Sequence, residues 1–192
     1  MKSVKEMEDE MLGALSDKAK KSSMIDPELF KKYQVKRGLR DIDGRGVLVG
    51  LTEIGEVRSY IVEDNEMVPI PGKLIYRGID INDLVNGFMK DGRFGFEETC
   101  YLLLFGDLPT KKELDDLNQL LGAYRKLPDN FVRDIILKMP SKDIMNSVAR
   151  SVLALYCLDD NPDDTSVENV LKQSLKLIAW FPLIAVRSEE RR

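Results

Sequence analysis

The sequence predicts a mainly α-helical fold with one small β-hairpin element. Three observations support this prediction: apolar residues recur at three- and four-residue steps through most of the chain, helix-starting and helix-ending residues bracket these stretches, and β-branched residues cluster in one region, residues 46–62. Hydrophobic residues make up 43% of the 192 residues, which is enough to form a core. No repeat, low-complexity tract or long linker separates independent domains.

The charge balance and the absence of histidine exclude several classes of function. Lysine and arginine total 29 against 33 aspartates and glutamates, so the net charge is −4, which argues against a nucleic-acid partner. Histidine is absent, which removes Ser-His-Asp and Cys-His catalysis and most zinc sites. The longest uncharged apolar run, residues 177–186, is half a membrane span. We therefore expect a cytoplasmic protein with no metal and no membrane segment.

The first 76 residues are expected to form two helices followed by the β element. Val4, Met7 and Met11 share a face of the first helix, and Asp26 with Pro27 begins a second helix that runs to residue 33. The β-branched residues of 46–62 flank residues 52–56, which predicts a hairpin with its turn there. Two prolines and a glycine at 69–72 interrupt the way to residues 74–76, so the sheet should be small.

From residue 80 onward the helical period returns, and capping residues divide it into separate helices. Asp80 begins one helix that Gly92 ends, and residues 96–105 form the next, which ends at Gly106. A capping box of Thr110 and Glu113 begins a helix that runs through residue 124. Two further helices are predicted over residues 128–139 and 141–158. The last helix begins at a capping box of Thr165 and Glu168 and continues through residue 179 toward Pro182.

Two of these helices are too apolar for an ordinary surface helix. Apolar residues cover well over half of the circumference between residues 144 and 158, and almost all of it between residues 175 and 186. Such helices form the centre of a core, or they contact another chain or another part of the fold. The sequence leaves both alternatives open.

Most local motifs have simple structural interpretations. The glycines at 44, 46 and 50 precede a predicted strand and miss the dinucleotide-binding spacing, and the acidic residues at 159–164 lack the pattern of a calcium loop. Cys100 and Cys157 lie in apolar stretches and are expected to be reduced core thiols. Basic residues enrich the first forty positions. Solvated helix faces account for most of them, and an anion site near Arg37 and Arg40 is the alternative.

Several segments of the chain resemble the citrate synthase family in order and spacing. The segments are residues 36–40, 44–52, 74–81, 96–110, 142–153 and 177–182. This resemblance implies that residues 1–192 are the amino-terminal part of a citrate synthase large domain, with the small domain and the catalytic part absent. The family's active-site histidines and aspartate have no counterpart in the chain, which agrees with its lack of histidine.

The family's reaction is the condensation of acetyl-CoA, oxaloacetate and water to citrate and CoA, in the tricarboxylic acid cycle. By resemblance, a coenzyme A thioester is a substrate, no cofactor is bound covalently, and Arg40 is a candidate ligand for a CoA phosphate. The chain offers no catalytic residue and should be inactive alone. The helices near 141–158 and 165–186 would form a homodimer interface, and a separate carboxy-terminal half could supply the catalytic groups. The alternative is a non-catalytic dimerisation or regulatory partner of a full-length synthase.

Overall fold

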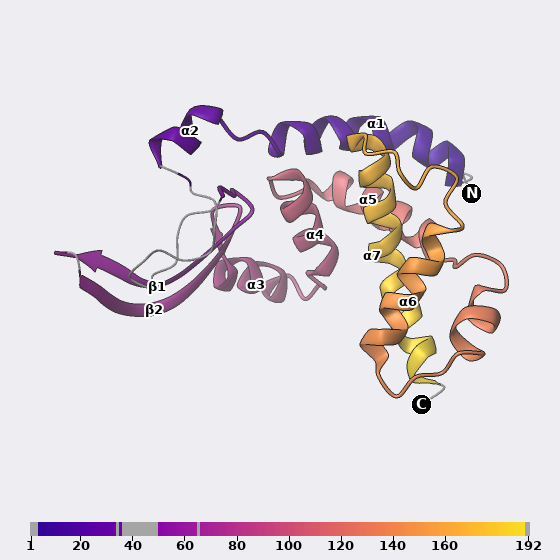
Figure 1. Ribbon diagram of the computed structural model, residues 1–192. Coiled ribbons are helices and arrows are strands. Elements are labelled where there is room, and N and C mark those ends of the chain that lie inside the picture. The colour runs from indigo at the N-terminus through magenta and orange to yellow at the C-terminus, as the bar shows by residue number, and fades with distance from the viewer. Residues whose placement is uncertain (1–3, 34, 36–49, 65, 191–192) are drawn as a thin grey trace. The chain divides into compact units, whose positions relative to one another are not determined.

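A computed structural model of the protein describes residues 4–33, 35, 50–64 and 66–190 (Figure 1). The chain divides into two compact units, one of residues 1–17 with 111–192 and the other of residues 18–110. One boundary falls inside the first helix and the other just before the fifth. No change of composition marks either boundary, which explains why the sequence shows no linker.

The predicted fold class is confirmed. The helices are α1 (Val4–Ser22), α2 (Pro27–Lys32), α3 (Ile81–Lys90), α4 (Phe96–Phe105), α5 (Lys111–Tyr124), the π-helix η1 (Val132–Leu137), α6 (Ile144–Tyr156) and α7 (Val167–Glu189). The strands are β1 (Gly55–Glu63), β2 (Glu66–Tyr76) and β3 (Ile79–Asp80), which form one antiparallel sheet in the order β1-β2-β3. None of the described helices is long and apolar enough to cross a membrane.

The hairpin lies further along the chain than the sequence predicted. Residues 52–56 do not form its turn, because β1 begins at Gly55 and pairs with β2 across residues 64–65. The prolines that suggested a break lie inside β2. Pro71 falls in a bulge where Arg58 pairs with Lys73 but Tyr60 pairs with Pro69, and an irregular ladder with an open edge tolerates residues that lack an N–H.

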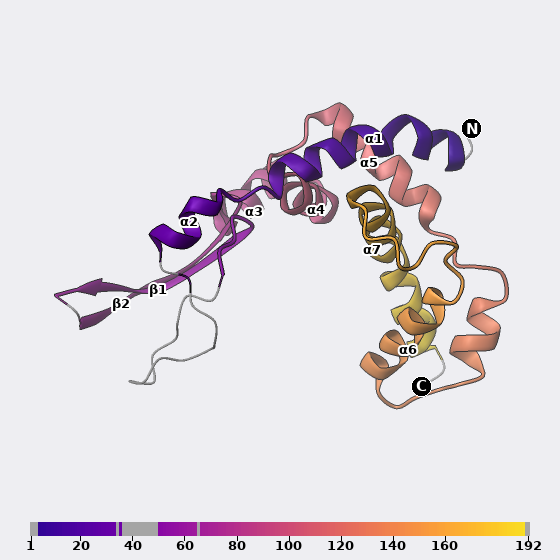
Figure 2. The same cartoon turned by 45° about the horizontal axis from the view of Figure 1, so that its top comes forward.

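The β1–β2 hairpin is exposed along almost its whole length. Every residue of β1 is exposed, and Figures 1 and 2 show the two strands as a ribbon that projects away from α3 and α4. Val57 and Val62 are 76% and 62% exposed. A two-stranded hairpin of this kind gains little from burial, so its stability depends on its base.

The base of the hairpin is tied to two helices of the same unit by one arginine. Arg77 and Gly78 have φ angles of 48° and 83° and form the two-residue turn between β2 and β3, a conformation that glycine adopts easily. The Arg77 guanidinium donates hydrogen bonds to the carbonyl oxygens of Leu103, at 3.1 Å, and Ser22, at 3.1 Å. This side chain therefore satisfies carbonyl groups near the ends of α1 and α4.

Two helix ends in this unit match the sequence prediction. The Asp80 carboxylate accepts a hydrogen bond from the Asn82 backbone N–H at 2.9 Å, and Gly106, with a φ angle of 90°, ends α4. The core of the unit includes Leu84, Tyr101, Leu102 and Phe105, all 5% exposed or less.

In the other unit, α7 is the central helix. It contacts α5, α6 and η1, and Figure 1 shows α6 and α7 side by side. Leu175 and Ile184 on α7 are both 0% exposed, and Ile184 belongs to a buried cluster with Phe131, Ile136 and Leu155. Helix α7 continues through Pro182 to Glu189. The core interpretation of this apolar helix therefore holds for much of its surface.

Two predicted helix starts are shifted. Asp143, rather than Ser141, caps α6, and its carboxylate accepts from the Asn146 N–H at 3.2 Å. Ser166, rather than Thr165, caps α7. In both cases several neighbouring residues are able to cap, and the backbone conformation selects among them. The predicted helix over 128–139 is shorter than expected and is a π-helix.

Candidate functional site

The one ligand residue predicted from the sequence cannot be placed. Arg40, its neighbour Arg37 and the glycines at 44 and 46 lie outside the described residues. Among the residues that are described, no group of three or more cysteines, aspartates or glutamates could hold a metal ion. The acidic loop at 159–164 forms hydrogen bonds within itself and with α6 and α7, for example from the Tyr156 hydroxyl to Asp163 at 2.9 Å.

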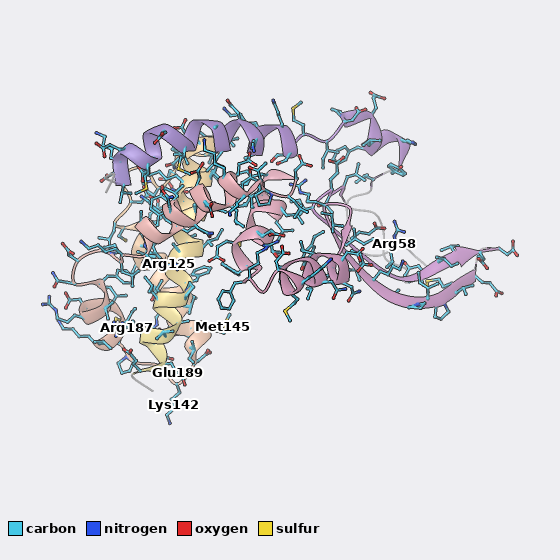
Figure 3. The ribbon with its side chains drawn as sticks, turned by 180° about the vertical axis from the view of Figure 1, so that it is seen from behind. Arg58, Arg125, Lys142, Met145, Arg187 and Glu189 are labelled. Carbon is cyan, nitrogen blue, oxygen red and sulfur yellow. The ribbon has the colours of Figure 1, made fainter. Side chains whose placement is uncertain are left out.

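Helix α6 carries the most prominent apolar surface of the predicted interface region. Met145, Ala149, Leu153 and Cys157 recur at four-residue steps and are all exposed, with Met145 and Leu153 at 76% and 71%. The side of α6 that faces its own unit carries Ser147, Ser151 and Leu155, which are buried. The stripe of exposed residues at 145, 149, 153 and 157, which we term the α6 stripe, is thus the opposite face of a packed helix (Figure 3, where Met145 is labelled).

Helix α7 also carries exposed apolar residues, but none of Val167, Val170, Phe181 and Val186 is as exposed as Met145 or Leu153. Phe181 and Val186 are 42% and 60% exposed. The structure therefore separates the two alternatives that the sequence left open: α7 is mainly a core helix, whereas α6 has one core face and one apolar face in contact with solvent. A face of the second kind is typical of a surface that is covered by another chain or segment.

A pocket of about 300 Å³ lies between α6 and α7 and the loop that joins them. Its wall combines the aromatic side chains of Tyr156 and Trp180 with Lys172, Gln173 and Lys176. A hydrogen bond to Asp163 raises the pKa of Tyr156, since ionisation would place two negative charges side by side. The pocket contains no histidine, and the carboxylates of Asp159 and Asp160 also line it, so its wall offers both positive and negative groups that can bind and orient a ligand.

A polar network that the sequence did not reveal joins three helices beside this pocket. Glu8 on α1 accepts hydrogen bonds from the Tyr124 hydroxyl, at 3.0 Å, and from the Lys172 ammonium, at 2.8 Å. The Lys176 ammonium lies 5.9 Å from the centre of the Tyr124 ring. Burial, and then the Glu8 charge, raises the pKa of Tyr124 well above its usual value. The partners are 116 and 164 residues apart, and no local pattern predicts such pairs.

The two cysteines differ from each other. Cys100 on α4 is half-buried, and burial raises the pKa of its thiol, so its position is closer to the predicted core thiol. Cys157 is exposed, so its prediction as a core residue is wrong. The reason is its position at the end of α6, in line with the exposed stripe and not with the buried face. Both cysteines are free thiols.

A comparison with protein families identifies the fold. A family model described as "Citrate synthase, C-terminal domain" matches residues 38–192. The chain belongs to the citrate synthase family. The resemblance of its motifs to that family is therefore confirmed. The description of the matching model names the carboxy-terminal domain, so the prediction of an amino-terminal segment gains no support from this match.

The relatives of this chain include proteins named 2-methylcitrate synthase and citrate synthase. The chain is 28% identical over 181 residues to the 2-methylcitrate synthase of Mycobacterium tuberculosis, and the match covers 94% of this chain and 40% of that protein. It is 40% identical over 122 residues to the citrate synthase of Saccharolobus solfataricus, a match that covers 63% of this chain and 30% of that one. The chain thus spans about 40% or less of the length of these relatives.

A solved structure supports the fold. The citrate synthase of Thermoplasma acidophilum, in a ternary complex with carboxymethyl coenzyme A and oxaloacetate, superposes with a TM-score of 0.58 at 21% identity. The match covers 82% of this chain and 36% of that one. At this identity the likeness shows a shared citrate synthase fold and leaves the ligands as properties of the archaeal enzyme.

Proposed function

We propose that this chain supplies an amino-terminal, large-domain part of a citrate synthase, which condenses acetyl-CoA with oxaloacetate in the tricarboxylic acid cycle in the cytoplasm, and that it is inactive by itself. The observation that carries the proposal is the combination of family membership with a complete lack of histidine. The family's chemistry, as the resemblance implies it, uses histidines and an aspartate to form the enol and to polarise oxaloacetate. A second polypeptide part must provide these groups.

The role that the proposal assigns to this chain is structural support and substrate binding. A coenzyme A thioester is the expected acyl donor, and Arg40 is the residue that would hold one of its phosphates, because a guanidinium donates paired hydrogen bonds to phosphate oxygens. In the reaction that the resemblance implies, histidines take part in the catalytic step, and this chain contains none.

The proposal includes a homodimer that the helices near 141–158 and 165–186 form. The α6 stripe supports it, because association would remove exposed apolar side chains from water. Full burial of a leucine contributes about 1.5–3 kcal/mol, so covering the exposed 71% of Leu153 contributes about 1–2 kcal/mol per protomer. In a two-fold dimer each residue acts twice, which corresponds to about 30- to 700-fold in the dissociation constant.

Sedimentation equilibrium tests the dimer. Leu153→Asp should weaken association at least as much as the loss of that burial implies. Val57→Asp is the matched control, because Val57 is 76% exposed on β1 and outside the predicted interface. Equal dissociation constants for the native chain and Leu153→Asp would contradict the role of α6.

Function is tested by complementation. Release of CoA from acetyl-CoA and oxaloacetate is measured with the chain alone, with a separately expressed histidine-bearing carboxy-terminal half of a citrate synthase, and with both together. The proposal predicts activity only in the mixture. Activity of the chain alone, or no activity in a mixture that demonstrably forms a complex, would contradict it.

The exposed α6 stripe also supports a second function, that of a non-catalytic partner which pairs with a full-length synthase. Titration of the chain into such an enzyme distinguishes the two. A change in the enzyme's rate that follows the amount of chain bound, without any activity in the complementation mixture, favours the regulatory partner.

A further inference from the structure

A second pocket, which no part of the proposed function uses, lies against the far end of α7. It has a volume of about 490 Å³, and the segment between α5 and η1, η1 itself and α7 all contribute to its wall. Three arginines line it, Arg125, Arg133 and Arg187, together with a single carboxylate, that of Asp129. Leu127, Val132 and Leu183 provide an apolar part of the wall. Figure 3 labels Arg125 and Arg187.

The charge of this pocket is opposite to that of the chain. The whole chain has a net charge of −4, whereas the pocket wall carries three guanidinium groups and one carboxylate. Three positive groups from separate segments that line one concave surface raise the local concentration of anions. A guanidinium also matches the geometry of phosphate and carboxylate oxygens, with which it forms paired hydrogen bonds.

The ion pairs of these arginines leave room for a ligand. Arg133 binds Asp134 through Nε and Nη2, and Arg187 binds Glu190 through Nη1, so each pair uses only part of the five donor positions of a guanidinium. The Arg133 and Arg187 side chains are 64% and 52% exposed. Exposed ion pairs of this kind are weak because water screens them, so a multiply charged anion competes with them readily.

The backbone around the pocket is unusual in two independent ways. Asn130, which lines it, has a φ angle of 63°, in the left-handed region that non-glycine residues rarely occupy. The next segment, η1, is a π-helix and supplies Val132, Arg133 and Leu137 to the wall. Both features occur frequently at functional sites.

We infer that the pocket of Arg125, Arg133 and Arg187 binds a small oxyanion with at least two negative charges, carried by phosphate or carboxylate groups. The three guanidinium groups hold the charges, and the apolar wall of Leu127, Val132 and Leu183 accepts a short carbon segment. This site is separate from the catalytic groups that the proposed function requires from another part of the protein, so its occupancy is measurable on this chain alone.

Isothermal titration of the full chain tests the site in 50 mM salt. Inorganic pyrophosphate is the phosphate probe and tricarballylate the carboxylate probe, so the two titrations identify which group the pocket prefers. We expect one binding site per chain for at least one probe. We also expect Arg133→Gln and Arg187→Gln each to weaken that binding by tenfold or more, and a higher salt concentration to weaken it further.

Matched variants separate a site from general attraction to positive charge. Arg58→Gln is the control, because the Arg58 side chain is 54% exposed and pairs with Glu56 in the same way, yet it lies on β1. Its affinity should equal that of the native chain. Arg187→Lys keeps the positive charge but loses the paired hydrogen bonds, so its affinity for the probe should lie between those of the native chain and Arg187→Gln.

Two titration results would contradict the inferred anion site. If neither probe binds, or if Arg58→Gln weakens binding as much as Arg187→Gln, the inference is wrong. Thermal unfolding of each variant, followed by circular dichroism, shows whether it is folded. Because Arg133 and Arg187 are exposed, at least one of the two substitutions should leave the fold intact.

Discussion

Substitution of Leu175 by alanine tests whether α7 is the centre of its unit. The Leu175 side chain is 0% exposed, and it lies on α7, which contacts α5, α6 and η1 along its length. A buried Leu→Ala substitution costs about 2.7–5.0 kcal/mol, and the cost rises with the cavity that remains. Because Leu175 is fully buried, we expect a loss within this range.

This loss is large compared with the free energy of unfolding of a typical domain, about 5–15 kcal/mol. For a chain of this size, 1 kcal/mol corresponds to about 2–4 °C, so the midpoint of thermal unfolding should fall by about 5–20 °C. Circular dichroism at 222 nm and urea titration measure the change. Leu108→Ala is the matched control, because Leu108 is 46% exposed, and it should cost less than about 1 kcal/mol. Equal losses for the two variants would refute the central position of α7.

Three further predictions concern other contacts. Because the pKa of Tyr124 is raised in the folded state, the free energy of unfolding should fall as the pH rises above about 10, and Tyr124→Phe should reduce that slope in pH-dependent urea titrations. Asp143→Ala should cost about 1 kcal/mol through loss of the α6 cap, which an unchanged urea midpoint would contradict. Gly106→Ala should destabilise the chain by about 1–3 kcal/mol, because the φ angle of Gly106 is 90° and a Cβ there would lie 3.2 Å from the Cβ of Ser22. Gly13→Ala should instead stabilise the chain by about 0.5–1 kcal/mol in the same urea titration, because Gly13 lies inside α1 with open space around it.

Helix positions were predictable because they depend on local features. The periodic leucines of α5, the Asp80 cap and the Gly106 end are each contained within a few residues, and the structure confirms those helices. The hairpin depends on pairing over a longer distance. Residues 52–56 resemble a turn, but the strand-forming residues that follow pair with a partner that contains Pro69 and Pro71, and a bulge accommodates them.

The pockets were not predictable from sequence patterns. Arg125, Arg133 and Arg187 line one surface, although 62 residues separate the first from the last and no motif relates them. The Glu8 network is similar, because its partners meet only after α1, α5 and α7 pack. The prediction that Arg40 binds a CoA phosphate came from the family resemblance, and Arg40 lies outside the described part of the chain. It stays a prediction.

The hydrophobicity of the helices near 141–158 and 165–186 could not show whether each is a core helix or an interface helix. That distinction depends on which faces of each helix the neighbouring helices cover. The structure covers most of α7 and leaves Met145 and Leu153 of α6 in contact with solvent. Of these two helices, α6 therefore has the more exposed apolar face, which is typical of a surface that a partner covers.

The most direct test of the proposed function is the rate of CoA release by the purified chain alone, produced in a host that lacks its own citrate synthase, with acetyl-CoA and oxaloacetate at saturating concentrations. The chain contains no histidine, and we expect a rate equal to that of the buffer. Turnover that increases in proportion to the chain concentration, and that Arg58→Gln leaves unchanged, would contradict the claim that the catalytic groups come from another part of the protein.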